Sequence, residues 1–347
     1  MNRDHKIEVN ELSSEQKSSM KSRVIVALIM CTFSIPCLFL GGWFFFFIVM
    51  AVLCLAILEI LKVPQKKYSI FICVFTYVLI LFFVYWIFVK NNIQAYIASS
   101  DDYYTYFAKI WPNGIFSIGF SDIIVSSIGI AVAACAFFFV SFLVEEFTLY
   151  DVCYLFTMSI LIGLGFQSFY FLRYYPLFLF DQFQVDISTP LFQYLHSAFL
   201  LIFVLIGTIC NDVGAYFTGI LFGRNKVNPR ISPKKTWEGI IGGAVFSVSF
   251  SSSFALIAAS LNYPILPTLG LDSWYWIVFL SMVIALLSNL GDFSFSAIKR
   301  FFHVKDYGNI LKAHGGVLDR FDSLIFSSLA VSVCVIFITN GWDFFVR

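Results

Sequence analysis

The sequence predicts an all-α integral membrane protein that crosses the bilayer about nine times. Of its 347 residues, 60% are hydrophobic and 12% are charged, whereas a soluble domain is about 45–50% apolar and about 25% charged. The apolar residues form runs of about 20, which is the length that a helix needs to cross a bilayer. The net charge is only +1, so no overall field indicates a nucleic-acid partner.

The expected spans follow a polar tail, residues 1–22, that we interpret as a cytosolic segment before an uncleaved first span. Only Gly41 and Gly42 separate the first two spans, so a tight hairpin and a re-entrant pair are both open. We divide the rest into an N-terminal transmembrane region, 23–195, and a C-terminal catalytic region, 196–347. The nine expected spans are 23–40, 43–61, 69–89, 119–143, 152–173, 196–222, 239–260, 274–291 and 323–341.

Lysine and arginine residues near the span ends predict the orientation, because cytoplasmic loops are enriched in both. With the N-terminus in the cytosol, the outer segments carry Lys90, Lys109, Arg173 and little else. The inner segments carry Lys62, Lys66, Lys67, Arg224, Lys226, Arg230, Lys234, Lys235 and the cluster within 292–322. We therefore expect both basic loops of the C-terminal half to lie in the cytosol.

The densest polar chemistry lies in and just before the segment 296–322, between two apolar spans. Asp292, Ser296 and Lys299 would share one face if the eighth helix continues past the membrane. Asp319 and Asp322 are three residues apart and would share a face at the start of the ninth.

Asp292, Asp319 and Asp322 would together suit a hard cation, because Mg²⁺ takes one or two carboxylates together with phosphate oxygens and water. The alternative is that these acids end the spans and pair with Arg300 and Arg320.

The tripeptide His314-Gly315-Gly316 lies within this segment. Glycines without side chains let backbone N–H groups approach an anion closely. His314 is either a general acid or base, or a histidine with a structural hydrogen bond.

A second basic block, Ser232 to Gly239, precedes the seventh expected span. Lys234, Lys235 and Thr236 are suited to a polyphosphate, because lysine binds phosphate as a point charge. A positive anchor at the membrane surface would explain the two lysines, but not Thr236 or Glu238. Upstream, Asp212 lies within an apolar span, where an acid is either functional or paired with a lysine of the adjacent loop.

Together these residues resemble the signature of the phosphatidate cytidylyltransferase (CDP-diacylglycerol synthase) family. The resemblance rests on a long, gapped motif and covers about residues 205–325. One position departs from the pattern, because Lys312 stands where the family usually has Pro or Gly. The matching positions are Ser296, Ile298, Lys299, Arg300, Lys305, Asp306, Gly308, the run His314–Val317, Asp319–Asp322, the block Ser232–Gly239, and Asn211, Asp212 and Gly214.

The resemblance implies an enzyme that joins CTP and phosphatidic acid into CDP-diacylglycerol and pyrophosphate at the membrane. Asp292 and Asp319 would be the main Mg²⁺ ligands, and a second, monovalent cation such as K⁺ and a homodimer are both left open. The groups facing the substrates' phosphates would be Lys299, Arg300, Lys305, His314 and Arg320, with Ser296, Gly315 and Gly316 nearby, and those along the CTP surface Asp212, Ser232, Lys234, Lys235, Thr236 and Glu238.

Two other readings remain open at this point. A related enzyme would use CTP with another lipid phosphate or with a polyprenol. A transporter would also need many spans, but it should carry charges near the middle of several of them. Here nearly all charge lies in the expected loops.

Overall fold

The computed structural model describes residues 32–98, 120–182, 195–308 and 315–340, and most of them are helical. Seven helical stretches among them are long and apolar enough to cross a membrane, and a shorter apolar stretch covers Ile70–Trp86. The all-α membrane class is therefore confirmed, and the number nine stays a prediction. The elements are α2 (Gly42–Lys62), α3 (Ile70–Ala98), α5 (Phe120–Leu143), α6 (Leu149–Gln182), α8 (Phe199–Phe222), β1 (Lys226–Asn228), β2 (Ser232–Thr236), α9 (Trp237–Ser260), η1 (Leu271–Ser273), α10 (Trp274–Phe301) and α11 (Leu318–Asn340).

Each expected span from 43–61 onward corresponds to one of these helices. The first expected span, 23–40, lies mostly outside the described residues, and its described part is helical up to Leu40. The helix is then interrupted at Gly41, and α2 begins at Gly42. The φ angles of these two residues, 63° and 50°, are positive and therefore favour glycine. Three helices continue beyond their expected ends, because α3 reaches Ala98, α6 reaches Gln182 and α10 reaches Phe301.

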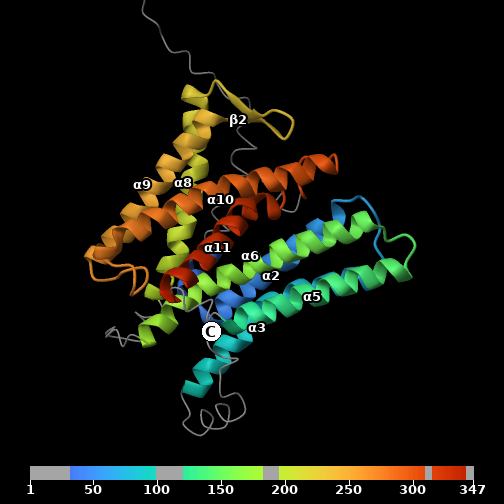
Figure 1. The fold of residues 1–347 in the computed structure, drawn as a ribbon, viewed down its shortest axis with the longest axis horizontal. Coiled ribbons are helices and arrows are strands. Elements are labelled where there is room, and N and C mark those ends of the chain that lie inside the picture. The colour runs from blue at the N-terminus through green and yellow to red at the C-terminus, as the bar shows by residue number, and fades with distance from the viewer. Residues whose placement is uncertain (1–31, 99–119, 183–194, 309–314, 341–347) are drawn as a thin grey trace, which may run out of the picture.

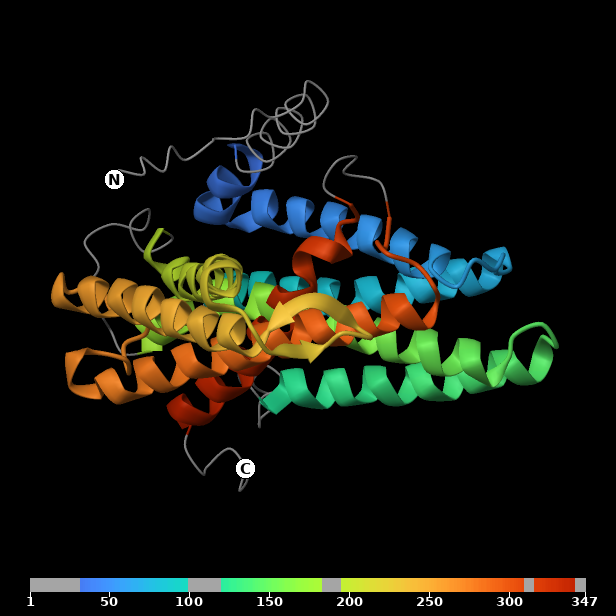
Figure 2. The same cartoon turned by 90° about the horizontal axis from the view of Figure 1, so that it is seen from above.

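The helices form two groups that meet along α6. In Figures 1 and 2 the N-terminal helices, coloured blue to green, lie on one side, and α8 to α11, coloured yellow to red, lie on the other. Helix α6 contacts α2, α3 and α5 in the first group and α8 and α11 in the second. Within the second group, α8 packs along α9 and α10 along α11.

Arg173 was expected in an outer loop, and that expectation is wrong. Arg173 is a residue of α6, and its side chain is completely buried. Its Nε donates to the carbonyl of Leu38 at 2.7 Å and its Nη2 to that of Phe39 at 3.0 Å, while Nη1 donates to Ser197. These carbonyls end the helical segment 32–40, so Arg173 supplies the donors that a helix C-terminus lacks. Arg173 therefore carries no information about orientation.

A short antiparallel hairpin joins α8 to α9 and stands at one end of these two helices (Figure 1). Its strands β1 and β2 pair Lys226 with Thr236 and Asn228 with Ser232. The hydroxyl of Thr236 caps α9 by accepting from the N–H of Gly239 at 3.2 Å. The second basic block is therefore a strand that leads directly into a transmembrane helix.

Candidate active site

Helix α10 carries the start of the charged segment on one continuous face. The hydroxyl of Ser296 donates to Oδ1 of Asp292 at 3.2 Å, as expected for residues four apart on a helix. The helix ends after Phe301, because His303 takes a left-handed φ of 56° and the N–H of Val304 donates back to the carbonyl of Lys299 at 3.0 Å. Lys299 thus lies in the last turn, where the negative end of the helix dipole favours a cation.

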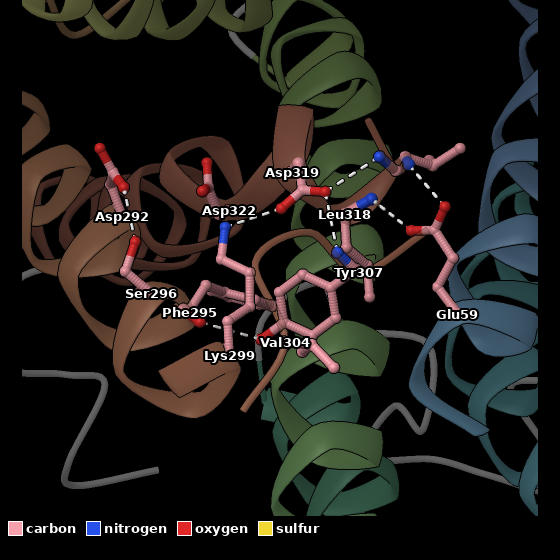
Figure 3. Close-up of polar contacts among 12 residues, drawn as sticks. Glu59, Asp292, Phe295, Ser296, Lys299, Val304, Tyr307, Leu318, Asp319 and Asp322 are labelled. Atoms are coloured by element: carbon pink, nitrogen blue, oxygen red, sulfur yellow. Dashed lines mark hydrogen bonds and ion pairs between the residues drawn. The ribbon is translucent and has the colours of Figure 1, made fainter. Parts of the chain in front are cut away.

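Asp319 connects α10, the turn after it and α11. Its Oδ1 accepts from Nζ of Lys299 at 2.7 Å, and its Oδ2 accepts from the N–H of Tyr307 at 3.0 Å and of Gly316 at 2.9 Å. Figure 3 shows this carboxylate between the ammonium group on one side and the backbone donors on the other. Gly315 lies beside it with a φ of 79°. The two ends of the motif are therefore held together around one carboxylate.

Tyr307, in the turn after α10, packs back against that helix. Its hydroxyl donates to the carbonyl of Phe295 at 3.2 Å, and its ring centroid lies 5.5 Å from Nζ of Lys299. Burial raises the pKa of Tyr307 above its ordinary value, because the phenolate would lose its hydration. Tyr307 therefore stays protonated and acts as a hydrogen-bond donor.

The two basic blocks, which are far apart in the sequence, meet in the structure. Lys235 on β2 forms an ion pair with Asp292 on α10, and its Nζ lies 4.2 Å from the ring centroid of Phe293. Nearby, Nε of Arg300 donates to the carbonyl of Ile231 at 3.3 Å. The hairpin is thus attached to the last turns of α10.

Three acids from three helices lie around this contact. Asp212 on α8, Asp292 on α10 and Asp322 on α11 repel one another electrostatically, and Lys235 attracts Asp212 as well as Asp292. Asp322 is buried, and its Oδ1 accepts from the N–H of Ser323 at 2.7 Å. Asp212 is exposed, whereas its neighbour Asn211 is buried and bonds to Ser288 and Asn289 on α10.

The acids fit a hard cation only together with substrate oxygens. Within the described residues, no group of three or more His, Cys, Asp or Glu side chains is placed to hold a metal by itself. Mg²⁺ rarely needs such a cage, because phosphate oxygens and water usually complete its shell. Asp292 and Asp322 interact electrostatically, and both oxygens of Asp292 and of Asp319 already have partners within the protein.

Several predicted site residues have structural contacts or are exposed. Thr236 is buried as the cap of α9, and Glu238 accepts from the N–H groups of Arg224 and Asn225, which fixes the start of the hairpin. Ser232 is half-buried at the start of β2. His314 and Lys312 lie outside the described residues. Among the predicted cationic site residues, those that are exposed are Lys234, Arg300, Lys305 and Arg320.

Tyr307 and Glu59 are both absent from the sequence-based predictions of this site. Glu59 lies on α2, in the N-terminal half, and is almost completely buried. Both of its carboxylate oxygens accept from backbone N–H groups at the start of α11. An acid inside an apolar run is a signal of function in a membrane helix, and it would have identified Glu59.

The fold and site define a helical integral membrane protein in which lysines and carboxylates from distant segments meet at helix ends. This chain belongs to the cytidylyltransferase family, whose model matches residues 21–338.

Curated relatives match shorter parts of the chain. A phosphatidate cytidylyltransferase of Bacillus subtilis is 42% identical over 115 residues, which cover 33% of this chain and 39% of the relative. Those of Haemophilus influenzae and Thermotoga maritima are 40% identical over 129 residues and 38% identical over 138 residues. These cover 37% and 40% of this chain, and 43% and 49% of the relatives. The matched segments thus span less than half of each of these three relatives.

Proposed function

We propose that this protein transfers the CMP group of CTP to phosphatidic acid, giving CDP-diacylglycerol and pyrophosphate. The observation that carries the proposal is the ion pair between Lys235 and Asp292. It unites the basic strand β2 with the charged end of α10, where cationic and anionic groups lie close together. The family membership and the named activity of the relatives support the same reaction.

The chemistry requires charge neutralisation more than proton transfer. A phosphate oxygen of phosphatidic acid attacks the α-phosphorus of CTP, a new P–O bond forms, and the bond from that phosphorus to the bridging oxygen of pyrophosphate breaks. A phosphomonoester has a second pKa of about 6, so the nucleophile is largely ionised at neutral pH. No general base is required, and His314 is best assigned as a phosphate or structural contact.

The protein's contribution is to hold two anionic substrates together, as in phosphoryl transfer in general. Lys299 and Lys235 bind phosphate oxygens as point charges. Arg300, Lys305 and Arg320 add positive charge around the site. Lys234 and Lys235 on β2 orient the triphosphate of CTP, whereas the space beside Gly316 is filled by Glu59.

Asp292 and Asp319, with Asp322 beside them, would hold a Mg²⁺ ion, and a second, monovalent cation remains open. A bound Mg²⁺ would neutralise the charge that develops on the α-phosphate and on pyrophosphate. Lys299 connects this site with the substrates. If a substrate phosphate attracts its ammonium group away from Asp319, Oδ1 of Asp319 becomes available to the metal ion.

The orientation that we propose places the hairpin and the charged segment in the cytosol. CTP is a cytosolic nucleotide, and phosphatidic acid holds its phosphate at the membrane surface. The asymmetry of lysine and arginine between the expected loops supports this orientation. Both substrates would then reach the ends of α8, α10 and α11 from the same side.

The test is an assay of the purified, detergent-solubilised protein with CTP, with and without Mg²⁺. We expect pyrophosphate release that requires both Mg²⁺ and phosphatidic acid. A panel with a polyprenol, a polyprenyl phosphate and lysophosphatidic acid examines the other acceptors. Turnover with one of these in place of phosphatidic acid would replace the proposed acceptor, and a lack of any CTP-dependent turnover would reject the enzyme class.

A further inference from the structure

Glu59 joins the N-terminal half of the protein to the proposed catalytic segment. Its Oε1 accepts from the N–H of Val317 at 2.7 Å, and its Oε2 accepts from the N–H of Leu318 at 2.8 Å. Its side chain is about 1% exposed, so water cannot replace either bond. Figure 3 shows Glu59 entering from α2 toward Leu318, on the opposite side of the motif from Lys299.

These contacts form a helix cap that comes from another part of the chain. Helix α11 begins at Leu318, and its first N–H groups have no partners within the helix. A carboxylate at such an end gains both hydrogen bonds and a favourable interaction with the helix dipole. A helix of the N-terminal half therefore determines where α11 starts.

Two glycines of the motif leave the space that Glu59 occupies. A Cβ atom on Gly308 or on Gly316 would lie 2.8 Å from an oxygen of the Glu59 carboxylate, which is closer than real Cβ contacts. The motif therefore needs glycine at these positions because the carboxylate passes between them. This explanation does not require either glycine to touch a substrate.

Glu59 and Asp319 hold adjacent parts of one backbone segment. The N–H of Gly316 donates to Asp319, and the next two N–H groups, of Val317 and Leu318, donate to Glu59. Three successive donors are thus fixed by two carboxylates from different helices. If the bonds to Glu59 were lost, the backbone that positions Asp319 would lose part of its support.

We propose that Glu59 is a positioning residue for Asp319, and that the N-terminal half completes the site through it. The catalytic side of this inference rests on the proposed cytidylyl transfer, whereas the structural side does not. Glutamine at position 59 keeps one acceptor oxygen but turns an N–H₂ group toward a backbone N–H. Glu59→Gln therefore loses one cap bond with little change in volume.

The experiment compares Glu59→Gln with Asp151→Asn in the full-length protein. Asp151 is also a buried acid of the N-terminal half, but its carboxylate binds Lys66, Tyr68 and Thr148 and none of the motif. Both variants exchange a buried carboxylate for an amide, so general destabilisation should appear in both. Effects on the motif should appear only in Glu59→Gln.

The first readout is hydrogen exchange of a peptide that covers residues 315–320, measured without substrates. We expect at least tenfold faster exchange in Glu59→Gln and unchanged exchange in Asp151→Asn. The second readout is the Mg²⁺ concentration that gives half-maximal turnover, which we expect to rise in Glu59→Gln with less change in KM for CTP. Unchanged exchange in Glu59→Gln, or equal changes in both variants, would overturn the proposal.

The two readouts separate this inference from the proposed function. If the unmodified protein shows no CTP-dependent turnover, the proposed function fails, yet the exchange experiment still tests the cap. If turnover is present and Glu59→Gln loosens residues 315–320 without changing its Mg²⁺ dependence, the cap exists but does not position Asp319. That outcome also overturns the proposal.

Discussion

Nζ of Lys299 on α10 lies 2.7 Å from Oδ1 of Asp319 on α11, and both side chains are about nine-tenths buried. The ion pair joins the two helices that enclose the motif, while the other oxygen of Asp319 holds the backbone between them. A buried pair of this kind is costly to break from one side, because the remaining charge loses its compensation. The same contact therefore contributes to the fold and to the proposed site.

Asp319→Asn should lower turnover about 100-fold or more, equivalent to at least about 2.7 kcal/mol of transition-state stabilisation. The amide keeps one acceptor oxygen for the backbone, and Lys299 keeps the electrostatic attraction of Asp322, so the protein should still insert and fold. Turnover per folded protein, with folding checked by size-exclusion chromatography, measures this. Asp272→Asn, at an exposed acid of η1, is the control. Full activity of Asp319→Asn would refute a metal role for Asp319.

Lys235→Ala should lower kcat/KM at least about tenfold more than Lys234→Ala, a difference of about 1.4 kcal/mol. Neighbouring residues of a strand point to opposite faces, and only Lys235 pairs with Asp292. Its loss leaves Asp212 and Asp292 without the shared cation that reduces their repulsion. Steady-state kinetics with varied CTP compare the two variants. Equal losses would show that β2 contributes only general positive charge.

Gly308→Ala should destabilise the protein by about 1–3 kcal/mol, because the new methyl group overlaps Glu59. Gly270→Ala should be nearly neutral, since a Cβ atom there meets nothing within 4 Å. Thermal unfolding in detergent measures both. In a Glu59→Ala background the cost of Gly308→Ala should shrink, because contacting residues are not additive. A cost that is the same in both backgrounds would contradict the contact.

Arg173→Met should lower the unfolding temperature clearly and leave KM for CTP unchanged. The methionine fills much of the volume but leaves the half-buried carbonyls of Leu38 and Phe39 without their donors, at about 1 kcal/mol for each lost hydrogen bond. Thermal unfolding and steady-state kinetics test this together. A changed KM with unchanged stability would place Arg173 in the binding of substrate instead.

Local patterns in the sequence were sufficient for much of the fold. Apolar runs predict the long helices α2, α3, α5, α6 and α8 to α11, because crossing a bilayer requires about 20 apolar residues in a row. The spacing of Asp292 and Ser296 predicts their shared face, and the hydrogen bond confirms it. The helix ends were less predictable, since α10 passes from apolar to charged residues without a break in its hydrogen bonding. The sequence predicts a loop at Arg173, because its hydrogen-bond partners are carbonyls 134 and 135 positions away and no local pattern indicates them.

The sequence by itself determined the membrane class, the polar segments and the residues of the family motif, since these depend on composition and local spacing. Only the tertiary structure decided which of these residues meet. Lys235 reaches Asp292 through a hairpin, and Glu59 reaches Val317 across 258 positions of the chain. Such contacts follow from how helices pack, because a buried carboxylate must find donors wherever the neighbouring helix presents them.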